Sequence, residues 1–530
     1  MALGYISLKG GWHPDAPMLG SGPAAGLRVC EGVYPSQGGY STLGTFTKAV
    51  DSIATNTDGF EHVWVDASGD PTVAYATGGV LGLSWSTRAA RVSPDGTPEY
   101  YNFVSWGDQC LAVNIEEDLS FALSGAEWAG VTYSHADPSA RFIEVLGNHV
   151  VLANVYLLTA HNALTATTYY PQMVWWSATD DPVAYSDPFT DPILNSDYQQ
   201  LLTVPGPITA IQKVADDAIA IFKTGGIELM VRTGGPDLFA FQTLAVGDQF
   251  GTRWNAAVCT VGRDIFFINA YGQLMVSQNM TQPKLVGAGK LYDTVLEPDT
   301  SGVNALHWYR TPDAWAFKDF ALRYDPTINC LVLLTTTSSG SAGDLARTLQ
   351  FYNVMTDEWS RVATIGRTWA SLTSWSGFSS ANKRKPCGTL VMDLNADFYA
   401  FTGDDNIAWE LETWPTPVQQ ASADGVQVAV KHQAIKRIKP VWNTMNIGGT
   451  ITLPTTYPTI SIEAADDFTM VNSQTKTMDE TYRDSAGWYS VPGGRIVGSN
   501  FVFNIQAAAA TGRIQGLHGF LVDYVEAGVA

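Results

Sequence analysis

The sequence lacks the residue patterns on which most enzymes and metalloproteins depend. Its eight histidines show no HExxH or HxH spacing, and GxSxG is absent. The five cysteines are odd in number and widely spaced, and no CxxC pair occurs, which excludes zinc ribbons and CxxC redox motifs. We therefore predict a chain that is not an enzyme, with no catalytic, cofactor-binding or metal-ligating residues and no cofactor.

Charged residues are scarce, at 15% of the chain, and acidic side chains outnumber basic ones by 51 to 30. The resulting net charge of −21 argues against a surface that grips nucleic acid, because phosphate neutralisation needs clustered Lys and Arg. The two short basic clusters, at 383–385 and 436–439, are interpreted as solvated loop or strand-edge charges.

Long apolar runs are also missing. None approaches the ~18 residues that a membrane helix needs, and the N-terminus lacks the basic and apolar blocks of a signal peptide. Reduced, buried thiols made in a cytosol are the expected state of the five cysteines. We expect a protein without a membrane-spanning segment that folds in a cytoplasm.

Short strand-like segments bounded by turn residues fill the chain, which contains 49 Gly and 26 Pro. A unit of turn, strand, turn and strand recurs along the chain. A single hairpin of this kind cannot bury both of its faces, so several must pack radially around a common axis. The pattern predicts an all-β fold, a β-propeller with irregular insertions whose blade number stays open. The copies lie near residues 63–70, 106–114, 146–154, 215–231, 261–276, 324–359 and 397–405.

The composition changes towards both ends. Residues 411–530 carry Thr/Pro-rich and alternating strands, which predict a β-sandwich or platform. Residues 1–60 are rich in Gly, Pro and Ser and are expected to form an N-terminal arm or platform segment, or else a plain loop. The propeller is assigned to residues 61–410.

One group of residues favours a different function. Asp180, Asp181 and Asp187 follow Trp175 and Trp176, and a glycosidase needs two carboxylates in a cleft where tryptophan can stack on sugar. Asp-Pro dipeptides are equally ordinary turn formers. A carbohydrate-binding or polysaccharide-degrading propeller is therefore the alternative function.

Other candidate motifs are weaker, because each lacks its required context. His13 with Asp15, and His135 with Asp137, pair imidazole and carboxylate without a placed nucleophile. Gly287–Lys290 is an incomplete P-loop, and the turns 93–96 and 422–425 lack the tryptophan of a sialidase Asp-box.

The order of motifs over roughly residues 100–280, and more weakly the C-terminal end, resembles the tail hub, nozzle or stabilisation proteins of short-tailed bacteriophages, the family of tail tubular protein B. The resemblance rests on the segments 140–154, 174–177, 180–182, 208–211, 218–231, 239–242, 262–268 and 271–272.

This resemblance implies a non-catalytic structural protein of the virion tail, made in the host bacterial cytoplasm. Six copies would form a ring below the tail adaptor, continue and close the DNA-ejection channel, and support fibres or tailspikes. Phage DNA would pass without specific binding, and an acidic wall suits this because it repels phosphate. A closed ring also needs heterologous contacts, in which one patch meets a different patch on the neighbour.

Overall fold

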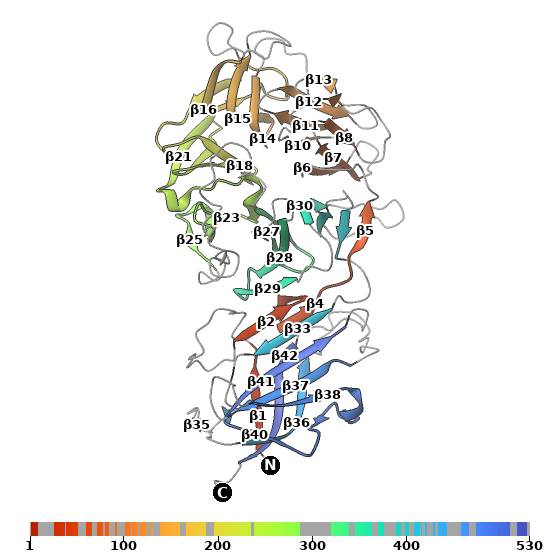
Figure 1. Ribbon diagram of the computed structural model, residues 1–530. Helices are drawn as coiled ribbons and strands as arrows, with labels where there is room; N and C mark the ends of the chain where they lie inside the picture. The colour runs from red at the N-terminus through yellow and green to blue at the C-terminus, as the bar shows by residue number, and fades with distance from the viewer. Residues whose placement is uncertain are drawn as a thin grey trace.

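The structure of the chain is a computed structural model (Figure 1). It describes residues 2–8, 26–37, 39–50, 60–65, 71–77, 80–83, 91–92, 101–107, 109–114, 117–123, 129–130, 138–158, 166–186, 195–234, 238–286, 320–338, 345–362, 369–375, 388–393, 398–401, 408–413, 415, 419–420, 428–429, 433–442, 457–465, 473–508 and 517–526. Their regular structure is β-strand with short 3₁₀ turns, so the all-β prediction is confirmed. Within these residues no helix has the length and apolar character to cross a membrane.

A ring of four-stranded sheets forms the upper body in Figure 1. Six of the seven blades that the described residues form are separate sheets, and the remaining one, blade six, is one end of a larger sheet. The first three blades are β6–β9 (Phe60–Val65, Pro71–Thr77, Val80–Leu83, Arg91–Val92), β10–β13 (Asn102–Trp106, Gln109–Asn114, Glu117–Leu123, Ala129–Gly130) and β14–β17 (Pro138–Leu146, His149–Leu158, Ala166–Trp176, Asp197–Gln200).

The remaining blades continue in chain order. They are β18–β21 (Ile208–Ala215, Ala218–Lys223, Gly226–Arg232, Phe239–Val246), β22–β25 (Val258–Val261, Asp264–Ile268, Leu274–Ser277, Lys284–Leu285), β26–β29 (Phe320–Asp325, Cys330–Ser338, Leu345–Asn353, Glu358–Val362), and β30–β32 (Trp369–Trp375, Gly388–Asp393, Phe398–Ala400) with β5 (Thr47–Val50).

The first strands of successive blades contact one another in the order β6, β10, β14, β18, β22, β26 and β30, and β30 returns to β6. The circle is closed, which is the defining property of a propeller. Blade seven takes its outer strand, β5, from near the start of the chain, where it pairs antiparallel with β32. The predicted propeller is confirmed.

A two-layer β-sandwich, the platform, lies below the propeller in Figure 1. One layer has seven strands: β1 (Ala2–Ser7), β3 (Val33–Ser36), β4 (Gly39–Thr42), β36 (Gln433–Trp442), β39 (Tyr489–Ser490), β40 (Ile496–Gly498) and β42 (Leu517–Glu526). The other contains β2 (Leu27–Glu31), β33 (Trp409–Thr413), β41 (Asn500–Ala507), β37 (Thr459–Ala465) and β38 (Gln474–Met478).

The smaller elements are two-stranded or single-turn. They are β34 (Gln419–Gln420) paired with β35 (Val428–Ala429), and the 3₁₀ turns η1 (Asp248–Phe250), η2 (Asn255–Ala257), η3 (Gln278–Met280) and η6 (Glu480–Tyr482).

Blade six and the platform share one nine-stranded sheet. The last strand of the blade, β29, lies parallel to β2, with Glu31 opposite Arg361. The same apolar core contains Trp359 of the blade, Trp409 of β33 and Phe503 of β41. Propeller and platform are therefore joined by a continuous core. Residues 1–60, expected as one segment, supply β1–β4 to the platform and β5 to the propeller.

Two turns of blade six show how the local sequence specifies a hairpin. Tyr324 donates its hydroxyl to Asn329 Oδ1 at 2.7 Å, and Tyr352 donates to Asp357 Oδ1 at 2.8 Å. Asn329 and Asp357 both have positive φ, 55° and 57°, which Asn and Asp tolerate better than other non-glycine residues. The repeated Tyr-to-Asx spacing therefore fixes both turns.

Candidate interaction surfaces

Exposed apolar side chains lie on the outer face of the seven-stranded platform sheet. Strand β1 pairs antiparallel with β42, so Leu3 lies opposite Asp523 and Tyr5 opposite Leu521. The alternate residue Ile6 points into the core. Leu3 is 63% exposed and Tyr5 44% exposed, although both belong to strands of a packed sheet. Val497 of β40 is 38% exposed and lies on the same side of the sheet. It pairs with Ala434 of β36, and a bulge in β36 separates Ala434 from the residues that lie opposite Asp523 and Leu521.

Basic residues of β36 continue this face. Beyond a bulge after Ile435, Arg437 lies opposite Asp523 and Lys439 opposite Leu521. Arg437 Nη2 forms an ion pair of 2.9 Å with Asp523, whose side chain is 2% exposed. Strand β36 pairs with β42 on one side and with β39 and β40 on the other. The prediction that residues 436–439 are loop or strand-edge charges is therefore wrong, because they belong to an interior strand.

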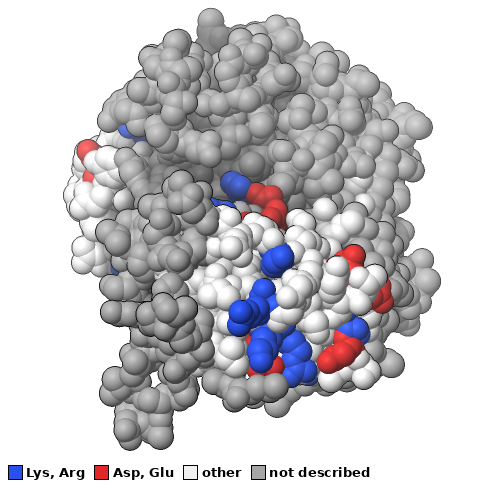
Figure 2. Space-filling view, turned by 60° about the horizontal axis from the view of Figure 1, so that its bottom comes forward, with Lys and Arg blue, Asp and Glu red and all other residues white. Residues whose placement is uncertain are grey.

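The turn at 487–488 gathers three cationic groups. The Arg437 guanidinium lies 5.1 Å from the Trp488 ring centroid, and that of Arg483 lies 3.6 Å from the Tyr457 ring. A Cβ at Gly487 would lie 3.6 Å from both Arg483 and Lys439, so these side chains flank the same turn. Figure 2 shows basic side chains gathered across the described surface at this end of the molecule.

We call the set of Leu3, Tyr5, Val497, Arg437, Lys439 and Arg483 the basic-apolar face. Stacked arginines keep their charge while their planes are fixed by the rings. Aromatic and arginine side chains are enriched at protein interfaces. The composition of this face matches the residue types that are enriched at protein interfaces.

Two neighbouring blades of the propeller, blades three and four, present the opposite charge. The hairpin turn between β18 and β19 carries Asp216 and Asp217, both exposed. In blade three, exposed Asp180 and Asp181 follow β16, and exposed Asp197 begins β17 directly opposite Trp176. All five leave the blades at the same end, because first and third strands run in the same direction. We call them the acidic turn face.

Neighbouring blades are connected at this end. The Arg232 backbone N–H donates to Asp217 O at 2.8 Å, and the guanidinium of Arg232 lies beside Gly147 in the turn of blade three. Asp180 N–H donates to Asn148 O of the same turn at 2.9 Å. The acidic turns of blades three and four therefore form one surface, with Arg232 between them.

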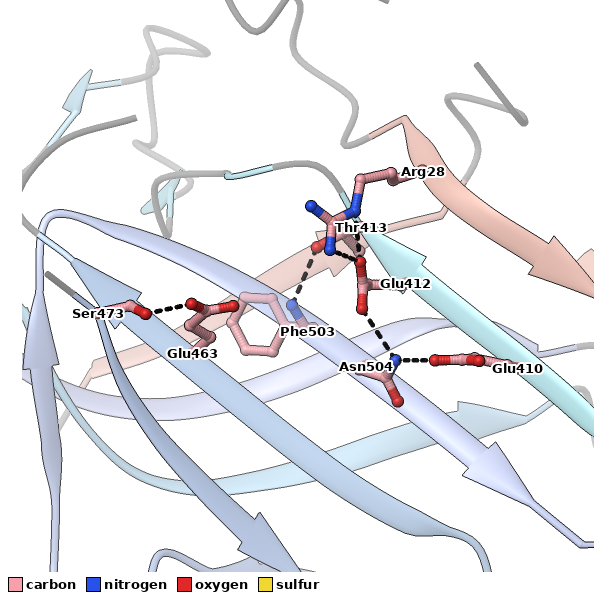
Figure 3. A network of polar contacts seen from close by, with 8 residues as sticks. All are labelled: Arg28, Glu410, Glu412, Thr413, Glu463, Ser473, Phe503 and Asn504. Carbon is pink, nitrogen blue, oxygen red and sulfur yellow. Dashed lines mark hydrogen bonds and ion pairs between the residues drawn. The ribbon is translucent and has the colours of Figure 1, made fainter. Parts of the chain in front are cut away.

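Carboxylates also line the outer face of the second platform layer, but they are engaged within the chain (Figure 3). Arg28 of β2 pairs with Glu412, and Asn504 Nδ2 donates to Glu410 and, at 3.0 Å, to Glu412. The network ties three strands together. Among the described residues no grouping of His, Cys, Asp and Glu could hold a metal ion. We interpret the network as structural.

The axis of the propeller is crossed by a hydrogen bond. Asn255, in the turn that leads into blade five, donates from Nδ2 to Asn102 Oδ1 of blade two at 2.6 Å. Blades two and five are not neighbours in the seven-bladed ring. Asn102 is held in turn by donating to Arg141 O of blade three at 2.8 Å. A DNA duplex, whose major groove alone is about 12 Å wide, cannot pass where the two side chains meet.

The tryptophans that motivated the carbohydrate alternative are buried. Trp175 is fully buried and packs edge-on against Tyr185 at 5.8 Å. Trp176, 7% exposed, packs against Phe239 at 5.3 Å. Asp180 and Asp181 are exposed, and Asp181 Oδ1 accepts the N–H of Val183 in a local turn. The two rings and the two carboxylates therefore do not form a sugar-binding cleft, and this motivation for the alternative is wrong.

The remaining sequence candidates lie outside the described residues. They are His13, Asp15, His135, Asp137, Asp187, Gly287–Lys290, the turns 93–96 and 422–425, and the basic cluster 383–385.

Four of the five cysteines are described, and all four are buried free thiols. Burial raises the pKa of Cys30 and of Cys110 well above the ordinary value, and that of Cys259 to about 11. Cys330 Sγ donates to Pro35 O at 3.4 Å, linking blade six to β3. These thiols stay protonated and serve packing rather than nucleophilic chemistry.

No protein-family model matches the chain, and no curated protein matches it. Among solved structures it is similar to BamB from Moraxella catarrhalis, with 11% identity over 69% of this chain and 94% of that chain, at a TM-score of 0.33. It is also similar to YCF48 from Cyanidioschyzon merolae, with 9% identity over 67% and 97% of the chains and a TM-score of 0.37.

Sequence reasoning missed the basic-apolar face. Leu3 and Tyr5 stand in a segment expected to be arm or loop, and they become a surface only when β1 pairs with β42. The alternation Leu3, Tyr5 and Ser7 was the available signal, since a half-buried strand repeats every two residues.

Proposed function

We propose that the chain is a non-enzymatic structural component of a short phage tail, a hub or nozzle protein of the virion. Copies would form a ring, six in number by the family resemblance, that continues and closes the DNA-ejection channel below the adaptor. Fibres or tailspikes would bind at its side.

The observation that carries this proposal is the sheet shared by blade six and the platform. A conduit wall must keep its shape while DNA and neighbouring proteins press on it, and a continuous sheet and core resist hinge motion between two bodies. The single core that contains Trp359 and Phe503 supplies that stiffness.

The crossed propeller axis limits where the conduit can run. Because Asn102 and Asn255 meet across the axis, DNA has to pass between copies of the chain and not through an individual propeller. The proposal therefore requires a ring whose central opening is lined by several copies. The net charge of −21 suits a lining that does not hold phosphate.

Negative-stain images of purified virions, labelled with an antibody against this chain, test the proposal. We expect label at the tail, below the adaptor, and cryo-EM of the same particles should show propellers around the channel with DNA outside each propeller axis. Antibody label confined to the capsid shell, or no label on intact particles, would contradict the proposal.

A further inference from the structure

The basic-apolar face differs in composition from the chain as a whole, and it exposes apolar side chains to solvent. The chain has 51 acidic and 30 basic side chains, yet residues 433–442 of β36 carry three basic side chains and no acidic one. Leu3, Tyr5 and Val497 expose apolar surface beside them. Exposed apolar side chains gathered on one face, next to arginines and aromatic rings, mark contact surfaces.

The ionic groups of this face are held in place before any partner arrives. Arg437 is fixed by Asp523 and by the Trp488 ring, and Arg483 is fixed by the Tyr457 ring. A side chain that is already ordered loses less conformational entropy on binding. Lys439 has no ion pair with a described residue, and it is the side chain whose charge a partner could neutralise.

The acidic turn face supplies the matching charge on the same molecule. Asp216 and Asp217 stand at the tip of a two-residue hairpin, and Asp216 is fully exposed, with a single ion pair to Lys213 at 3.3 Å. Complementary potentials steer association and fix register. Nucleic acid would match the lysine and arginines, but it gives no role to the exposed aliphatic side chains of Leu3 and Val497.

We infer that the basic-apolar face of the platform docks on the acidic turn face of blades three and four in a second copy of this chain. The two surfaces differ and lie on different bodies of the molecule (Figure 1). The contact is therefore head-to-tail, and repetition of such a contact gives a ring if the rotation closes and a filament if it does not. The inference rests on the proposed function only for the closure of the ring.

Charge reversal on each face tests the contact in the full-length chain. Lys439→Glu alters the platform without disturbing the Arg437–Asp523 pair, and Asp216→Lys with Asp217→Lys alters the propeller at a turn where neither residue has positive φ. Sedimentation of the wild-type chain should show self-association that weakens as salt rises. Each variant alone should associate at least about tenfold more weakly.

Mixing the two variants distinguishes a head-to-tail contact from a symmetric one. The Lys439→Glu chain keeps an intact acidic face, and the aspartate variant keeps an intact basic-apolar face. Their mixture should give one-to-one dimers that do not grow, since the other face of each chain is disabled. A chain carrying all three changes should recover association in part, because the reversed charges again attract.

Two further variants guard against misfolding and misplacement. Lys284→Glu, on exposed strand β25 of blade five, reverses a lysine elsewhere and should leave association unchanged. Leu3→Ser should weaken association and leave the thermal unfolding temperature near that of the wild type, because Leu3 is 63% exposed.

Several outcomes would overturn the inference. One is a wild-type chain that stays monomeric at ~100 μM in low salt, and another is a mixture of the two variants that forms no dimers. A third is that Lys439→Glu abolishes binding to a 30-base-pair DNA duplex and leaves self-association unchanged, which would assign the face to nucleic acid. Tail labelling by the antibody would persist in each case if the proposed function holds, so the two failures are distinguishable.

Discussion

The propeller and the platform are built from strands that meet in opposite ways. In the propeller, β10–β13, β14–β17, β18–β21 and β22–β25 pair strictly in chain order. In the platform, β1 pairs with β42, and β2 lies between β29 and β33. A propeller blade is thus specified by local turns, whereas the platform exists only when both ends of the chain come together. Their described surfaces differ too, acidic at the turns of blades three and four and basic-apolar on the platform.

The largest expected effect is at the joint between the two bodies. Trp359 is 2% exposed, packs against Tyr352 at 4.7 Å and belongs to the core that blade six shares with the platform. Trp359→Ala should cost about 3–5 kcal/mol, as for other buried tryptophans. Hydrogen exchange should rise in blade six and in the platform together.

Trp175→Ala is the matched control for this joint, since Trp175 is as deeply buried but belongs to a separate core between blades two and three. It should cost a similar free energy and raise exchange in those blades, leaving the platform protected. Equal exchange across the whole chain in both variants would show that the joint has no special role.

A second contrast concerns ion pairs. In the propeller, Lys223 and Glu228 are 0% and 4% exposed, and the Lys223 ammonium also donates to the carbonyl oxygens of Leu201 and Val204. Lys223→Met leaves a buried carboxylate and should cost about 3–5 kcal/mol. In the platform, the Asp523 carboxylate is also buried, but its partner Arg437 is 38% exposed. Arg437→Met therefore lets water reach the carboxylate and should cost less, about 1–2 kcal/mol.

Urea unfolding of the two methionine variants measures this difference. We expect the smaller loss of unfolding free energy for Arg437→Met, because water can reach the Arg437 site and replace part of the lost interaction. A larger loss for Arg437→Met than for Lys223→Met would contradict this prediction.

A smaller effect than that of the tryptophan and lysine substitutions is expected where β1 pairs with β42, when one methyl group is added at Gly519. A Cβ at Gly519 of β42 would lie 2.1 Å from Ile6 O of β1, so Gly519→Ala must push the two strands apart. We expect a loss of about 1–3 kcal/mol, typical of overpacking, with early proteolytic cleavage near the N-terminus. Ser7→Ala, at the position opposite Gly519, is the control and should leave the cleavage pattern unchanged.

The smallest expected effect is a pH dependence in the propeller. Burial lowers the pKa of His149 below its ordinary 6.5, against the opposing hydrogen bond of Nδ1 to Ser177 O at 2.8 Å. The unfolded chain therefore binds the proton more readily, and stability is lost as pH falls below 6.5. Urea midpoints measured from pH 7 to pH 5 should decline less in His149→Gln than in the wild type. An unchanged slope would exclude His149 as a cause.

The same comparison explains what the sequence could predict. Segments such as 215–231 predict a hairpin, because the turn and both strands lie close together in the sequence. The structure has the end of β18, β19 and β20 there. The N-terminal strands could not be paired from the sequence, since Tyr5 meets a partner 513 residues away. Burial of Trp175 and Trp176 was equally hidden, because a strand in a propeller blade is covered on both faces by its neighbours.

The pairing of β1 with β42 also sets an order of events during synthesis. At roughly 5–20 residues per second, the ribosome needs on the order of 25–100 seconds to make the 513 residues that separate Tyr5 from His518. Throughout that time β1 lacks its partner, while blades two to five can close behind it as they emerge. Of the two bodies, the platform is therefore the later to form, so a growing chain can offer the basic-apolar face only after the strands of its propeller have been made.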